Sequence, residues 1–183
     1  ARLAESRRRG ESSGRLGEFF GAAVVMSRTF AAVVTNPPYF NRYDDRLRAF
    51  LDRHYRHFAG DLFSAFMKRN MDFCRSGGYA GFLTPFVWMF IRKYEPARRE
   101  IIDNSGIVTL IQFEYSAYEE ATVPLCAFVL VNDRRDAPGG YFRLTGFRGG
   151  MDVQRRKAEE ALLDPDGCGY FYRVSQRALD AIP

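Results

Sequence analysis

A short apolar run at Phe30–Thr35 (FAAVVT) is followed at once by an amide, two prolines and an aromatic ring. Short runs of apolar and β-branched residues that end in turn-forming residues are typical of buried strands. Proline has no backbone N–H to donate to a sheet, so the strand must end where the prolines begin. The sequence therefore predicts a buried strand whose carboxyl end carries Asn36, Pro37, Pro38 and Tyr39.

Downstream of this strand, segments with helical apolar spacing alternate with short apolar runs. The clearest helix begins after Asp61, which is expected to be its N-cap, and Gly77-Gly78 is expected to end it. Further helices are predicted at 44–58, 95–104 and 151–163, and further strands at 79–84, 107–113, 124–131 and 140–147, with irregular structure from Asp164.

This order of elements predicts an α/β fold with a mostly parallel sheet that helices cover on both faces. The last two predicted strands have no helix between them, so an antiparallel strand is expected at the edge of the sheet. In such sheets ligands bind beyond the carboxyl ends of the strands. Asn36 lies at such an end, which favours a binding site over a simple turn.

Composition excludes some functions and leaves others open. Lysine and arginine outnumber aspartate and glutamate by 27 to 22, which is compatible with a nucleic-acid partner, although single basic clusters also suit solvated helix faces. The cysteines and histidines lack metal-ligand spacing, so no metal site is expected. No apolar run approaches the ~18 residues of a membrane span. Unpaired cysteines favour a cytoplasmic protein.

The residues from Asn36 to Tyr39 suit a planar substrate that carries an amino group. The exocyclic amine of adenine is a poor nucleophile because its lone pair is delocalised into the ring. Two fixed acceptors, an Asn side-chain oxygen and a carbonyl held between prolines, can take both amino hydrogens and free the lone pair. Tyr39 then offers a face for the base to stack on. A base in duplex DNA would have to be flipped out to reach them.

The stretch resembles the catalytic motif of amino-methyltransferases, in which Asp, Asn or Ser precedes Pro-Pro and an aromatic residue. The longer match, FAAVVTNPPYF, then GDLFSAFMKRNMDFCRSGGYAGFLTPFVWMF, then EYSAYEEATVPLCAFVLVND and GGYFRLTGF, resembles the catalytic domain of the PglX-type adenine-N6 methyltransferases of phage-exclusion (BREX) systems. It covers most of the chain from Phe30 onward.

The resemblance implies a Rossmann-like methyltransferase fold, S-adenosylmethionine as cofactor and a flipped adenine of double-stranded DNA as substrate. It assigns amine polarisation to Asn36, Pro37 and Pro38 and base stacking to Tyr39. A second stacking aromatic is expected among Tyr115, Tyr118 and Phe128, and 124–131 would be the edge hairpin strand. Phe40 and Asp61 are candidates for cofactor or substrate contact, although packing and helix capping explain them equally well.

The same resemblance predicts three regions: an N-terminal segment at 1–29, helical or disordered; the carboxyl-terminal part of the catalytic domain at 30–150; and a helix with the start of a following region at 151–183. The glycine-rich turn that binds the cofactor is missing before Asn36, and both ends look cut. We therefore expect a fragment that is inactive alone. Other phage-defence proteins are expected as partners of the whole enzyme.

Two alternatives remain open. Protein-glutamine and RNA amino-methyltransferases share the chemistry of this motif, although the basic, aromatic stretch RAFLDRHYRHFAGDLF suits DNA better than a peptide. The second alternative is a non-catalytic remnant that only binds DNA or proteins.

Overall fold

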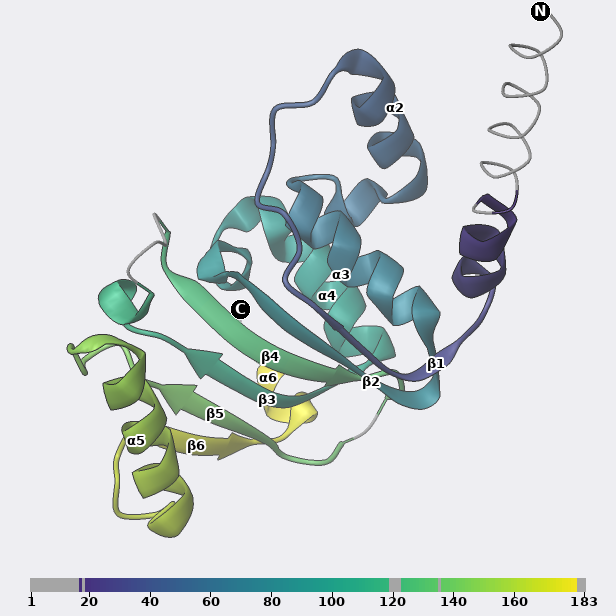
Figure 1. Cartoon of the computed structure of the whole chain (residues 1–183). Coiled ribbons are helices and arrows are strands. Elements are labelled where there is room, and N and C mark those ends of the chain that lie inside the picture. The colour runs from purple at the N-terminus through teal and green to yellow at the C-terminus, as the bar shows by residue number, and fades with distance from the viewer. Residues whose placement is uncertain (1–16, 18, 119–122, 135, 181–183) are drawn as a thin grey trace, which may run out of the picture.

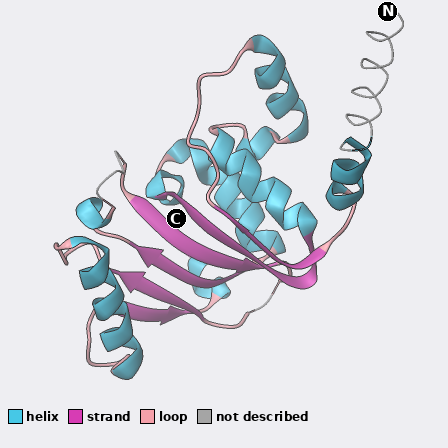
Figure 2. Cartoon of the chain, viewed as in Figure 1, coloured by secondary structure: helices cyan, strands magenta, loops and turns pink. Residues whose placement is uncertain are grey.

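The computed structural model describes residues 17, 19–118, 123–134 and 136–180, and residues 1–16 of the predicted N-terminal segment lie outside this description (Figure 1). A mixed sheet with strand order β1-β2-β4-β3-β5-β6 forms the centre (Figure 2). β1 pairs with β2, and β3 with β5, in parallel, whereas β4 is antiparallel to both its neighbours and β6 to β5. The strands are β1 (Phe30–Thr35), β2 (Cys74–Pro85), β3 (Gly106–Gln112), β4 (Leu125–Val131), β5 (Gly139–Arg143) and β6 (Phe171–Val174).

Helices lie on both faces of this sheet, as predicted. α3 and α4 cover the face behind the sheet as Figure 1 is drawn, and α5 packs on the front of β5 and β6. The helices are α2 (Asp45–His54), α3 (Leu62–Phe73), α4 (Glu95–Asn104), α5 (Gly150–Leu163) and α6 (Gln176–Asp180), with 3-10 turns η1 (Arg56–Phe58), η2 (Phe86–Met89), η3 (Arg92–Tyr94) and η4 (Tyr115–Ala117). Residues 19–26 are also helical. No helix in the described ranges is long and apolar enough to span a membrane.

The predicted start of α3 is confirmed and its predicted end is wrong. Asp61 is the N-cap and forms a capping box with Ser64. The helix ends at Phe73, and Gly77 and Gly78 lie inside β2. Gly78 is required there by crowding rather than by a helix stop, because a Cβ would meet the Phe30 carbonyl oxygen at 3.0 Å.

Two strands depart from the expected arrangement. The strand predicted at 124–131 is not at the edge but inside the sheet, where β4 pairs with β2 on one side and β3 on the other. The segment after Asp164, expected to be irregular, contains β6, which is the antiparallel edge strand. Because α5 packs on this sheet and β6 pairs within it, the sheet continues past residue 150.

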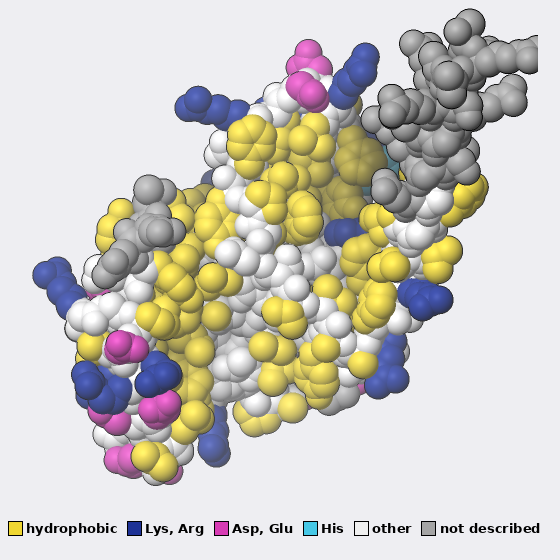
Figure 3. Space-filling view, in the orientation of Figure 1, with side chains coloured by type: hydrophobic (Ala, Val, Ile, Leu, Met, Phe, Trp, Pro, Cys, Tyr) yellow, Lys and Arg dark blue, Asp and Glu magenta, His cyan; other side chains and the backbone are white. Residues whose placement is uncertain are grey.

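The two faces of β1, β2 and β4 differ in how they are covered. Ala80, Phe82 and Phe128 belong to the core cluster beneath α3 and α4. On the opposite face Val34 is 82% exposed and Tyr79 is also exposed. Figure 3 shows this face, where hydrophobic and uncharged side chains predominate in the middle and charged ones gather toward the rims. Among the described residues β1 pairs only with β2, so its other edge is free.

Candidate active site

The segment after β1 lies at the carboxyl ends of β1 and β2, as the sequence predicts. Pro37 is buried, which anchors the segment, whereas Asn36 and Pro38 are exposed. The Tyr39 side chain is also exposed, with 39% of its surface accessible. The Asn36 amide and the Tyr39 ring therefore lie on an accessible rim, and Pro37 between them is buried.

The Tyr39 hydroxyl connects this rim to the neighbouring strand. Its oxygen lies 2.8 Å from Asn36 Oδ1 and 3.2 Å from the Leu83 carbonyl oxygen, and its one hydrogen is shared between these acceptors. The contact turns the Asn36 side-chain oxygen toward Tyr39 and limits rotation of the amide. An amide oxygen has two lone pairs, so Asn36 keeps the capacity to accept a second hydrogen bond.

The surroundings of Tyr39 keep its hydroxyl protonated. Burial raises the pKa of Tyr39 to about 12, and the nearby Cys126 thiol and Tyr118 hydroxyl add to this effect. Phe63 meets the Tyr39 ring edge-on, with 6.4 Å between the ring centroids. Contacts with Phe63 and, at the hydroxyl, with β2 thus hold the ring in place. The hydroxyl acts as a donor across the physiological pH range.

Asp61 holds the far end of the same segment. Its Oδ1 accepts hydrogen bonds from the backbone N–H groups of Phe40, at 3.0 Å, and of Phe63, at 3.3 Å. Leu62 N–H donates in turn to the Phe40 carbonyl at 2.8 Å. Asp61 is buried, so its contacts are those of a helix cap that also positions the rim. The Phe40 side chain is exposed and lies edge-on to Tyr43.

The structure separates the three aromatic candidates for a second stacking ring. Phe128 is only 2% exposed, stacks on Phe82 with 5.0 Å between centroids and packs on Trp88, so it is a core residue and the expectation for it is corrected. Tyr115 is exposed on η4. Tyr118 is partly buried beside Phe113 and close enough to Tyr39 to affect its pKa. Tyr118 is therefore the candidate that shares a site with Tyr39.

Two residues packed beneath the rim, Thr84 and Cys126, were not predicted from the sequence to be part of the site. Thr84 and Cys126 are fully buried, with 3.6 Å between the Thr84 hydroxyl and the Cys126 sulfur. Burial raises the pKa of the Cys126 thiol to about 11, so it stays neutral. The contact of Tyr39 with the Leu83 carbonyl was also missed, because it depends on β1–β2 pairing. The one indication in the sequence that Leu83 would lie near Asn36 is that residues 79–84 are predicted to form a strand that ends at Pro85.

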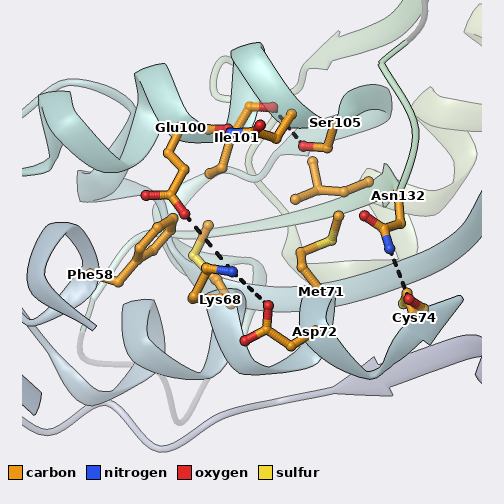
Figure 4. A pocket seen from close by; sticks show the side chains of 12 residues that line it. Phe58, Lys68, Met71, Asp72, Cys74, Glu100, Ile101, Ser105 and Asn132 are labelled. Atoms are coloured by element: carbon orange, nitrogen blue, oxygen red, sulfur yellow. Dashed lines mark hydrogen bonds and ion pairs between the residues drawn. The ribbon is translucent and has the colours of Figure 1, made fainter. Parts of the chain in front are cut away.

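A cavity of about 350 Å³ lies away from this rim, between α3 and α4 at the opposite end of β2 (Figure 4). Its floor is apolar, with Met67, Met71 and Leu130. The charges at its mouth satisfy one another, since Lys68 binds Asp72 at 2.5 Å and approaches Glu100 at 3.9 Å. In the described residues no group of three or more His, Cys, Asp or Glu side chains gathers as a metal site.

Among the described residues, the glycine-rich segment at 146–150 most resembles a cofactor-binding turn, but it does not lie beside Asn36. It follows β5 and leads into α5, with Gly149 and Gly150 at positive φ. Three strands, β2, β4 and β3, separate β5 from β1. The described residues beside Asn36 thus form one wall of a site, and they do not complete a pocket for a nucleotide-like cofactor.

Comparison with known proteins identifies this architecture. The model of the Eco57I restriction-modification methylase family matches residues 10–118. The chain is 25% identical over 178 residues to the adenine-specific methyltransferase BrxX of Escherichia coli O9:H4 (strain HS), which covers 94% of this chain. The chain spans only 14% of the length of that relative.

Solved structures share the fold. A type I restriction-modification methyltransferase subunit from Streptococcus thermophilus superposes with a TM-score of 0.64 at 15% identity, over 84% of this chain and 36% of that one. A Listeria monocytogenes protein described as a class I S-adenosylmethionine-dependent methyltransferase gives 0.54 at 15% identity, over 73% of this chain and 42% of that one. The fold is therefore the Rossmann-like methyltransferase fold.

Proposed function

The chain belongs to the Eco57I restriction-modification methylase family, and we propose that its protein is a site-specific DNA adenine-N6 methyltransferase of a bacterial phage-defence system. In this proposal the segment from Asn36 to Tyr39 forms the substrate side of the active site. The similarity to an adenine-specific BrxX methyltransferase supports the choice of adenine.

One observation carries the proposal: an exposed Asn36 whose side-chain oxygen is oriented by the Tyr39 hydroxyl at 2.8 Å. The flipped adenine would donate its amino hydrogens to Asn36 Oδ1 and to the Pro37 carbonyl oxygen. Neither acceptor titrates, and buried Pro37 fixes the backbone between them. Accepting both hydrogens concentrates the lone pair on nitrogen, which makes it a nucleophile without a covalent enzyme intermediate.

The cofactor is S-adenosylmethionine, which supplies the electrophilic methyl group. The described residues do not complete its pocket, and among them Asn36 is proposed to lie nearest the cofactor. The free edge of β1 and the uncovered Val34 support a further proposal, in which another segment of the protein pairs with β1 and brings the cofactor turn beside Asn36.

Double-stranded DNA is the proposed partner, and Tyr39 is the proposed stacking ring, with Tyr118 as the second aromatic. Extrusion of the adenine is required because its N6 atom is held in the duplex. Association with other BREX-type defence proteins and a bacterial cytoplasmic location belong to the same proposal.

A substrate comparison tests this function. The full-length protein is incubated with methyl-labelled S-adenosylmethionine and, separately, unmethylated genomic duplex DNA, RNA and a glutamine-containing peptide. We expect label in duplex DNA, recovered as N6-methyladenine after digestion. Label in RNA or peptide without DNA would refute the assigned substrate, and label in none of them would favour a protein that only binds.

A further inference from the structure

Two adjacent apolar side chains are exposed at the tip of the loop that follows β2. Phe90 is 60% exposed and Ile91 is 47% exposed, between the 3-10 turns η2 and η3. Exposed single apolar residues are common, but a neighbouring pair at the mouth of a site is a candidate contact surface. We call the segment 86–93 the apolar loop.

The apolar loop is held firmly in this conformation. One nitrogen of Arg98, Nη1, donates to the carbonyl oxygens of Trp88, at 2.7 Å, and of Ile91, at 2.9 Å. The N–H of Ile91 donates to the Val87 carbonyl at 3.0 Å, and Trp88 is buried in the core. Because the backbone is fixed on both sides of the tip, Phe90 and Ile91 are presented to solvent by the fold.

The loop and the Asn36–Tyr39 rim are fastened to the same turn before α3. Lys93 Nζ donates to the Gly60 carbonyl at 2.7 Å, and the next residue, Asp61, binds the N–H of Phe40 at 3.0 Å. The Phe63 ring contacts the rings of both Tyr39 and Tyr94, with centroid distances of 6.4 and 5.7 Å. The apolar loop therefore forms a second rim at the carboxyl end of β2, beside the candidate site (Figure 1).

The charge of the loop suits a polyanion. From Pro85 to Tyr94 the chain carries Arg92 and Lys93 and no acidic side chain, and both basic residues are exposed. Basic residues of this kind position a protein on phosphates. Two exposed cations directly follow the apolar tip, and this pairing suits duplex DNA, which offers phosphates beside a stack of apolar base faces.

We propose that Phe90 and Ile91 form a wedge that enters the base stack of the target duplex beside the adenine that is extruded toward Asn36. This proposal rests on the proposed function. Apolar side chains inserted at a base step unstack it, and a wedge of this kind fills the space that a flipped base vacates. Arg92, which directly follows the tip, contacts a phosphate beside that step.

The test uses the full-length enzyme and two synthetic duplexes that carry its site, mapped beforehand by sequencing N6-methyladenine in the host genome. One duplex is fully paired, and the other has an abasic residue opposite the target adenine. Unpairing costs a few kcal/mol in a paired duplex, so Phe90→Ala with Ile91→Ala should slow methyl transfer there by roughly 10- to 100-fold. On the abasic duplex, where the adenine has no partner, we expect a rate within about 3-fold of wild type.

Matched variants separate a wedge from simple packing. Phe90→Leu with Ile91→Leu keeps the apolar bulk and should retain most activity on both duplexes. Leu162→Ala with Leu163→Ala removes an even more exposed apolar pair from α5, far from the rim, and should change neither rate. Three results would each overturn the wedge proposal. The alanine variant could methylate paired DNA at the wild-type rate, or it could lose the same activity on both duplexes. It could also show a lowered melting temperature, which would indicate that Phe90 and Ile91 pack on another segment of the protein. A wild-type enzyme inactive on DNA would instead refute the proposed function.

Discussion

The Tyr39 hydroxyl donates a hydrogen bond to the Asn36 side-chain oxygen across 2.8 Å, from a ring that is also tied to the Leu83 carbonyl of the next strand. One aromatic side chain thereby orients the proposed amine acceptor and presents a surface for the base. The two roles can be separated by substitution, because the hydroxyl serves the first and the ring the second.

Tyr39→Phe removes the hydroxyl and keeps the ring. A net hydrogen bond is worth ~0.5–1.5 kcal/mol, so we expect the single-turnover methyl-transfer rate of the full-length enzyme to fall about 2- to 10-fold. Tyr39→Ala also removes base stacking, worth ~1–3 kcal/mol, and should cost a further factor of roughly 10 to 100. Equal rates for the phenylalanine variant and wild type would show that the hydroxyl does not position Asn36.

Asp61→Ala should destabilise the protein and loosen the rim. Its carboxylate caps α3 and binds the Phe40 N–H, and losing a cap together with a buried acceptor costs about 1–3 kcal/mol. The measurement is denaturant unfolding of the full-length protein. Asp44→Ala, which removes the exposed cap of α2, is the matched control and should cost less, about 0.5–1 kcal/mol. If both substitutions lowered the free energy of unfolding equally, the role of Asp61 in binding the Phe40 N–H would be contradicted.

Phe128→Ala and Tyr118→Leu should have opposite signatures. Phe128 lies in the core between Phe82 and Trp88, so its truncation should destabilise the fold by about 3–5 kcal/mol. Tyr118→Leu keeps apolar packing against Phe113 and should lower the methyl-transfer rate with a small change in melting temperature. Full activity of Tyr118→Leu would remove it as the second stacking ring.

Alkaline pH should destabilise the protein through three tyrosines that are at least partly buried. Burial raises the pKa of Tyr39, Tyr43 and Tyr94 to about 12, from an ordinary value of 10.0. The folded state therefore keeps protons that the unfolded chain releases, and this stabilisation is complete below pH 10 and lost as the pH rises toward 12. Phenolate absorbance and circular dichroism should change together in that window. Ionisation of these tyrosines near pH 10 in a folded protein would contradict their burial.

The local features of the site were predictable because adjacent residues determine them. The two prolines end β1 at Thr35, directly before Asn36, and the Asp61 cap begins α3. Both are found where the sequence placed them. The glycines at 77 and 78 misled the prediction, because both lie inside β2. Gly78 is needed for a close approach to the Phe30 carbonyl, and Gly77 adopts a positive φ.

The contacts across the sheet were not predictable, because they depend on pairing between distant segments. β4 reads as apolar on both faces, so sequence alone did not reveal that Phe128 points into the core while Ala127 lies on the opposite face. The interior position of β4 and the contact of Tyr39 with Leu83 follow from strand order, which local patterns do not encode.

Asn36→Ala in the full-length enzyme tests the central claim most directly. Removing a preorganised polar group at the reacting atom typically costs roughly 100- to 1000-fold, and we expect that loss in single-turnover methyl transfer to duplex DNA. Asn41→Ala, which removes an exposed amide from the same segment, should stay within about 2-fold of wild type, and both variants should melt as wild type does. A wild-type rate for Asn36→Ala would contradict the assignment of Asn36 as the amine acceptor.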